Sequence, residues 1–271
     1  MPPLLENKNY AAPSVFSPEG LLREARRQKQ LPEQPVPAIC LLDPDGDIVR
    51  QLSGDGTASL CPAWACYHTS MHRFTYDGLE IGVVGCAVGS AFAVLVAEQM
   101  FASGCELLLS VTSSGQITPV TDPPYFILID RAVRDEGTSY HYLPPSEHSH
   151  LPALLSPVLG EATSALAEKG FAVLQGATWT TDAPFRETAE AIEHHRQNGV
   201  VAVEMEAAAL YAFAEARQKS VICVAHVTNQ MANISGDFEK GVANGVYDAL
   251  SVVSALATAW RKTARTETMI P

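Results

Sequence analysis

Val201–Ala214 reads V-A-V-E-M-E-A-A-A-L-Y-A-F-A, an apolar run that carries two carboxylates, Glu204 and Glu206, with Met205 between them. An unpaired carboxylate in a protein core is costly, so both acids should have hydrogen-bond donors or give up their charge. The start of the run is strand-like, whereas A-A-A-L-Y-A-F-A favours helix by propensity. Glu206 is therefore predicted to lie near a strand-to-helix junction.

Two interpretations of this junction are open. At the first turn of a helix, free backbone N–H groups keep a carboxylate ionised and ready to accept hydrogen bonds from a ligand's hydroxyls. The acid can equally cap the helix without any ligand, because capping acids are common at helix starts.

Composition narrows the class of protein. The chain has 271 residues, 47% apolar and 18% charged, which suffices for a sizeable core. Its formal net charge of -12 argues against nucleic acid or an anionic membrane as partner and leaves a small substrate possible. The cysteines form no C-x-x-C pair and sit mostly in apolar runs. With neither a signal peptide nor an apolar run of about 18 residues, we expect a cytoplasmic protein.

Strand-like and helix-like segments alternate after an N-terminal arm, residues 1–35, which contains one short helical stretch at 18–30 and is of the kind that packs on a neighbouring subunit. Residues 36–271 are predicted to form a single domain. Strands are expected at 36–42, 79–84, 106–112, 125–132, 171–175, 200–203 and 221–228, and helices near 90–103, 155–169, 184–197, 206–218 and 245–264. The alternation indicates an α/β sandwich, with a mostly parallel sheet covered by helices.

Ligands of such sheets bind beyond the carboxyl ends of strands, and four of these ends are unusual. Asp43–Asp47, D-P-D-G-D, is acidic, though it also fits a solvated turn. Gly85–Gly89 permits close backbone approach but matches neither the Rossmann G-x-G-x-x-G spacing nor that of a P-loop. Ser113–Gly115 can hold an oxyanion or a sugar hydroxyl, or form a plain polar turn. Asn229 can offer a donor and an acceptor to a heterocycle edge, or cap the next element.

Phe185 and Arg186 place an aromatic ring beside a cation, a pair that can stack on and hydrogen-bond a planar base. Asp182 and Pro184 also fit a helix start there, and both interpretations can hold together. The three histidines between residues 141 and 150 surround two prolines, so no metal site is expected.

Val203–Ala208, V-E-M-E-A-A, resembles the V-E-M-E-A signature of the purine nucleoside phosphorylase and uridine phosphorylase family, which also contains nucleosidases. Arg131–Tyr142 and Thr181–Phe185 are more similar to the uridine phosphorylase branch. The resemblance runs from about residue 36 to 233. It implies a three-layer α/β sandwich with a central mixed, mostly parallel sheet flanked by helices.

The resemblance also implies roles for individual residues. Glu206 would accept the ribose 2′- and 3′-hydroxyls, Met205 would contact the sugar and Glu204 would support the pocket. Asn229 stands at the base-contacting position and, with Phe185 and Arg186, would read a carbonyl-bearing base.

The implied activity is cleavage of the N-glycosidic bond of a nucleoside by a homo-oligomeric enzyme, with phosphate as co-substrate and no cofactor. A hydrolytic nucleosidase and a catalytically silent nucleoside-binding protein are the alternatives.

The sequence departs from the family where phosphate binds. The family's first turn reads G-D-P-x-R, but Leu42–Gly46 lacks both the Gly and the Arg, and Ser110 replaces a second phosphate-binding Arg. No histidine precedes His68 to serve a neighbouring subunit's site. Ser113, Ser114 and Gly115 are left to hold phosphate, with a cation to be brought in from Arg50, Arg73 or Arg134. A guanidinium beside Ser113 would favour phosphorolysis, and carboxylates alone would favour hydrolysis or a catalytically silent binding protein.

Overall fold

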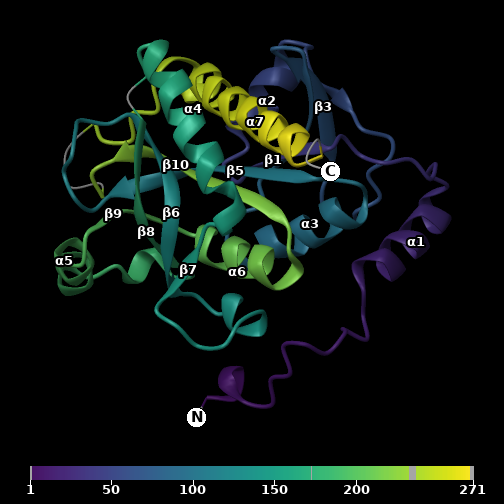
Figure 1. Cartoon of the computed structure of the whole chain (residues 1–271), viewed down its shortest axis with the longest axis horizontal. Coiled ribbons are helices and arrows are strands. Elements are labelled where there is room, and N and C mark those ends of the chain that lie inside the picture. Colours follow the sequence, from purple (N-terminus) through teal and green to yellow (C-terminus); the bar gives the residue numbers. More distant parts are fainter. Residues whose placement is uncertain (1, 172, 232–235, 269–271) are drawn as a thin grey trace.

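The computed structural model describes residues 2–171, 173–231 and 236–268 (Figure 1). Its helices are α1 (Pro18–Lys29), α2 (Asp47–Gly54), α3 (Ser90–Ala102), α4 (Ser156–Glu168), α5 (Ala189–Gln197), α6 (Ala207–Arg217) and α7 (Val246–Thr268). Its strands are β1 (Ile39–Asp43), β2 (Ser59–Leu60), β3 (Met71–Tyr76), β4 (Leu79–Gly85), β5 (Leu107–Gln116), β6 (Tyr125–Asp135), β7 (His148–His150), β8 (Val173–Thr181), β9 (Val200–Glu204) and β10 (Ser220–Asn229). All expected strands and helices are present, so the α/β class is confirmed.

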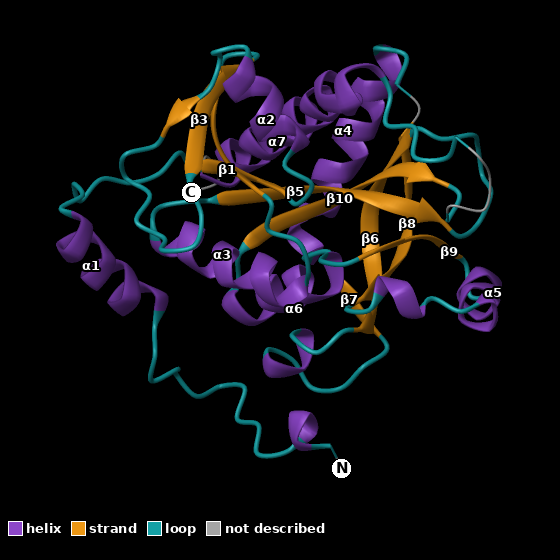
Figure 2. Ribbon diagram, turned by 180° about the vertical axis from the view of Figure 1, so that it is seen from behind, coloured by secondary structure: helices purple, strands orange, loops and turns teal. Residues whose placement is uncertain are grey.

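Helices cover the sheet on two sides, with α2, α4 and α7 on one and α3 and α6 on the other (Figures 1 and 2). Residues 207–214 of α6 are at most 1% exposed, because a helix that is apolar all round must be buried all round. The Tyr211 hydroxyl in this run donates to the Ile129 carbonyl at 2.6 Å and accepts the Cys223 N–H at 3.1 Å. Its one polar atom is therefore satisfied inside the core.

The sheet differs from the expected central, mostly parallel one. Parallel pairs join β1 to β4 and β5, β5 to β10, and β8 to β6 and β9, while antiparallel pairs are as numerous. Strands β5, β10, β6, β8 and β9 are joined in a closed ring, because β5 pairs with both β10 and β9. Register shifts, with the extra residue in β6, β9 and β10, bend these strands, as bulges do, and so allow the closure. A simple layered sandwich describes only the β5–β1–β4–β3 part.

Strands β2, β3 and β7 and helix α2 were not predicted. The β3–β4 hairpin turns at Asp77 and Gly78, which both have positive φ, and α2 begins in the acidic stretch after β1. Strand β7 pairs with β6 and carries His148 and His150. The region 41–54 thus supplies a strand, a tight loop and a helix, and that loop lies next to β5 in the site described below.

The two ends of the chain pack differently. The stretch Val242–Ala264, which includes most of α7, has the length and composition of a membrane span, contrary to the sequence expectation. It packs on α4, and its buried Leu250 and Leu256 mark it as a core helix of a folded domain. At the other end, Leu22 and Ala25 of α1 are buried against Ala65, while most residues before α1 are exposed in an extended segment (Figure 1).

Candidate active site

Glu204 ends β9 and is fully occupied by protein donors. One carboxylate oxygen accepts the hydroxyls of Thr178, at 3.0 Å, and Thr180, at 2.5 Å. The other accepts the backbone N–H groups of Glu206 and Ala207, both at 2.7 Å. A carboxylate has about four acceptor positions, so Glu204 has none left for a ligand. It caps α6 and anchors β8, and its role in supporting a sugar pocket stays a prediction.

Glu206 lies at the junction between β9 and α6, as predicted, and is 1% exposed. Its Oε1 accepts the Gly89 N–H at 2.7 Å and its Oε2 accepts the Met205 N–H at 3.3 Å, and the nearby Thr112 hydroxyl lowers its pKa. Gly89 immediately precedes α3, so the first turns of two helices meet at this carboxylate. Because the Met205 contact is long and Glu206 does not cap α6 through its side chain, acceptor capacity remains for a ligand.

The two acids interact electrostatically. Burial raises the pKa of both, and the nearby Glu204 charge adds to raise the pKa of Glu206 to about 8. The four donors on Glu204 oppose the effect of burial on its pKa. Hydrogen bonds donated by a ligand to Glu206 would lower the pKa of Glu206.

Ser113, Ser114 and Gly115 do not form a turn after a strand, contrary to the sequence prediction. They lie within β5, where β10 pairs with all three and β9 with Gly115. The strand continues past Thr112 because both neighbours supply backbone partners there. The Ser114 hydroxyl is buried and has no partner among the described residues. A Cβ at Gly115 would clash with the Met231 sulfur, so any larger residue here requires the Met231 side chain to move.

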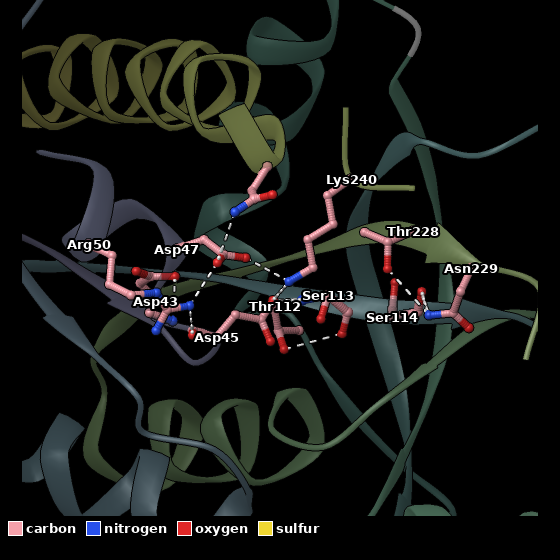
Figure 3. Close-up of polar contacts among 12 residues, drawn as sticks. Asp43, Asp45, Asp47, Arg50, Thr112, Ser113, Ser114, Thr228, Asn229 and Lys240 are labelled. Carbon is pink, nitrogen blue, oxygen red and sulfur yellow. Dashed lines mark hydrogen bonds and ion pairs between the residues drawn. The ribbon is translucent and has the colours of Figure 1, made fainter. Parts of the chain in front are cut away.

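The acidic loop after β1 folds onto this part of β5 (Figure 3). Asp43 is 2% exposed and accepts the N–H groups of Gly46, at 3.1 Å, and Val49, at 2.9 Å, which shapes the loop and starts α2. Burial raises the pKa of Asp43 to about 6. Asp45 reaches across to β5, where its Oδ2 accepts the Ser113 N–H at 3.1 Å. The expected anion-binding N–H thus already has a carboxylate partner.

Two cations neutralise this loop. The Lys240 ammonium lies 3.1 Å from Asp45 Oδ2 and 2.6 Å from Asp47 Oδ2 (Figure 3). The Arg50 guanidinium donates to the Asp45 carbonyl at 2.8 Å and to Asp47 Oδ1 at 2.7 Å. Lys240 was not predicted, because nothing local in residues 236–245 marks it as a partner of residues almost two hundred positions earlier.

The other arginines considered as phosphate ligands are placed elsewhere. Arg134 is buried and donates to the hydroxyls of Ser139 and Ser146 and to the Pro144 carbonyl. Arg73 is exposed on β3. Within the described residues, no hydrogen bond or ion pair joins a guanidinium to Ser113.

Asn229 ends β10 and faces β5. Its Nδ2 makes long hydrogen bonds to the Ser114 carbonyl, at 3.4 Å, and to the Thr228 hydroxyl, at 3.3 Å, while its Oδ1 accepts the Met231 N–H at 3.0 Å (Figure 3). The oxygen thus stabilises the chain reversal after β10. The bonds of the amide nitrogen are long, so it retains capacity to donate to a ligand.

Phe185 and Arg186 lie in a short turn between β8 and α5 and both are exposed, Phe185 at 98%. In the described part of the chain, no hydrogen bond links Arg186 to Asn229 or Glu206. Their assignment to the base stays a prediction. Nor do the described residues contain a group of three or more His, Cys, Asp or Glu side chains that could hold a metal ion.

Known proteins are similar to this chain in sequence. The sequence model of the Phosphorylase superfamily matches residues 46–258, and the chain belongs to that family. A guanosine phosphorylase of Halorubrum lacusprofundi is 25% identical over 141 residues, which are 52% of this chain and 57% of that protein. A DeoD-type purine nucleoside phosphorylase of Bacillus cereus is 30% identical over 141 residues, 52% of this chain and 59% of that protein. The chain therefore spans less than two thirds of the length of these relatives.

Solved structures are similar over more of the chain. The purine nucleoside phosphorylase of Toxoplasma gondii, in complex with immucillin-H, has a TM-score of 0.70 at 16% identity and covers 87% of this chain and 95% of its own. The AMP nucleosidase of Bacteroides thetaiotaomicron has a TM-score of 0.68 at 21% identity, covering 91% and 99%. At these identities the likeness concerns the fold.

Proposed function

We propose that this protein cleaves the N-glycosidic bond of a ribonucleoside. Glu206 carries the proposal, because a buried carboxylate at the meeting point of two helix starts, with acceptor capacity left over, suits a vicinal diol. Glu204, with all its positions filled, holds Glu206 and Met205 in place. Family membership supports the same reaction class, since both phosphorylases and a nucleosidase are among the similar proteins.

The chemistry follows from this arrangement. The bond between C1′ and the base nitrogen breaks as positive charge develops on the sugar, so negative charge at the ribose side stabilises the transition state. Glu206 becomes ionised as its hydrogen bonds to the diol form, and it can then supply that charge. The departing base is met by Asn229, whose amide nitrogen can donate to a carbonyl oxygen. We therefore favour inosine, guanosine or uridine over adenosine, with Phe185 and Arg186 as further candidate contacts.

We also propose the cellular compartment of the reaction and the assembly state of the protein. Nucleoside breakdown or salvage in the cytoplasm fits an acidic chain with mostly buried thiols. A homo-oligomer fits the exposed N-terminal arm, which could pack on a neighbouring copy. No cofactor is needed for this chemistry.

The test is a product screen. Purified protein is incubated with inosine, guanosine, uridine and adenosine, each with and without phosphate, and the free base is followed by chromatography. Release of an oxo base is expected, faster than release of adenine. Binding of a nucleoside without release of any base would leave a silent binding protein as the correct description, and preferential turnover of adenosine would remove the role given to Asn229.

A further inference from the structure

We call the part of the site where phosphate or water would bind the acceptor end. A side chain of the protein itself occupies it. Asp45 Oδ2 accepts the Ser113 N–H at 3.1 Å and lies 3.1 Å from the Lys240 ammonium (Figure 3). A backbone N–H and a cation are the two kinds of group with which proteins bind phosphate. The Asp45 carboxylate has therefore taken the contacts that a phosphate oxygen would need.

The charge around these contacts opposes a second anion. Asp43, Asp45 and Asp47 supply three carboxylates, and the cations bonded to this loop are Lys240 and Arg50. His226 adds no charge, because burial and the nearby Lys240 lower its pKa to about 4. At neutral pH the cluster is net negative and would repel a phosphate dianion.

The space left over fits water. A cavity of about 20 Å³ lies among Asp45, Asp47, Thr112, Ser113 and His226, and a single water needs roughly 10–15 Å³ measured in this way. His226 is 6% exposed, and its side chain makes no hydrogen bond within the residues that the structure describes, so it can bond to such a water. Thr112 lines this cavity, and its hydroxyl is close enough to Glu206 to lower the pKa of that carboxyl, so the cavity adjoins the Glu206 end of the site.

We infer that Asp45 determines the acceptor: its carboxylate stands in for phosphate on Ser113 and Lys240, and water from the adjoining cavity attacks the sugar. This inference rests on the proposed function. In the reaction, the C1′–N bond breaks with its electron pair going to the base, and the water oxygen forms the new bond to C1′. The water gives one proton to a carboxylate of the acidic loop, which passes it on to solvent, and the departing base takes up one proton from solvent, so that no net proton is released. The products are free ribose and the neutral base.

The experiment compares two matched variants. Asp45→Ala vacates the Ser113 N–H and Lys240, whereas Asp47→Ala removes a partner of Lys240 but leaves Asp45 in place. Inorganic phosphate is titrated calorimetrically into the wild type and both variants, with circular dichroism to verify folding. We expect Asp45→Ala to bind phosphate at least tenfold more tightly than the other two proteins. Asp45→Asn, which keeps the shape and loses the charge, replaces Asp45→Ala if the latter does not fold, with the same expectation.

The sugar product completes the test. With its best nucleoside, the wild type should release free ribose at a rate independent of phosphate, and Asp45→Ala should form some ribose 1-phosphate. Ribose 1-phosphate from the wild type, or equal phosphate affinity in the two variants, would overturn the inference and leave the proposed function intact. Failure of the wild type to cleave any nucleoside would instead remove the proposed function, and with it water as the acceptor.

Discussion

The carboxylates of the β9–α6 junction and of the β1–α2 loop, the two ends of the proposed site, differ in how their hydrogen-bonding capacity is used. At the junction, Glu204 takes four donors and Glu206 keeps acceptor capacity free. At the loop, Asp45 and Asp47 are bonded to Ser113, Lys240 and Arg50. The first region is prepared for a ligand, while the second satisfies its charges internally. A binding site is thus recognised by unused hydrogen-bonding capacity rather than by the presence of acids.

The largest expected effects come from the matched pair Glu206→Gln and Glu204→Gln. Glu206→Gln should weaken ribonucleoside binding by about 10- to 150-fold, because hydrogen bonds to a charged acceptor contribute about 1.5–3 kcal/mol. Glu204→Gln should lower the free energy of unfolding by about 1–3 kcal/mol, since an amide cannot accept all four hydrogen bonds. Calorimetric titration and urea denaturation measure the two quantities. A 2′,3′-dideoxynucleoside, which lacks the diol, should bind with equal affinity to the wild type and to Glu206→Gln. If the two variants changed ribonucleoside affinity and the free energy of unfolding in the same way, the distinction between the two acids would be wrong.

A smaller effect is expected from pH. Because burial and Glu204 raise the pKa of Glu206 to about 8 from an ordinary value of 4.5, the folded state binds a proton that the unfolded chain releases at neutral pH. This stabilisation is complete below about pH 4.5 and is lost as pH rises through about 8, which amounts to about 1 kcal/mol between pH 7 and 9. Urea denaturation across that range should show a larger loss in the wild type than in Glu206→Gln, in which Glu187, whose pKa burial raises to about 7, still contributes. Parallel curves for the two proteins would mean that Glu206 is ionised throughout.

The smallest effect is expected at the exposed edge of the loop. The Arg50 side chain is 60% exposed, and its ion pair with Asp47 is of the surface kind that contributes about 0–1 kcal/mol. Arg50→Gln should therefore change the free energy of unfolding by less than about 1 kcal/mol and leave ribonucleoside affinity unchanged. Calorimetric titration together with denaturation at low and high salt checks both. A large loss of affinity would show that the loop holds the nucleoside as well.

The local sequence was sufficient to predict the proposed ribose end of the site, but not the proposed acceptor end. The strand, Glu206 and the helix are consecutive, so propensity and burial alone place Glu206 at a junction. Even Thr178 and Thr180, polar residues two apart on buried β8, carry a signal for a nearby polar group that sequence reasoning can use. The acceptor end instead depends on Asp45, Ser113 and Lys240, which only the folded chain brings together.

The fold, like the site, has features that the local sequence predicts and features that depend on distant segments. The Asp77-Gly78 pair is a recognisable hairpin signal, so β3 was open to prediction. The extension of β5 through Gly115 was not, because a strand end depends on which neighbours offer hydrogen bonds, and those neighbours come from β9 and β10. Closure of the ring has the same non-local origin.

That closure also bears on aggregation. Unpaired strand edges are templates for joining other chains, and a ring of strands has none. In the described part of the chain, the sheet ends on one side at β3 and the two-residue β2, and the strand added to the ring, β7, has three residues. Little backbone is left on which another chain could add a strand. We therefore expect this protein to associate through side-chain surfaces and helices rather than by extending its sheet.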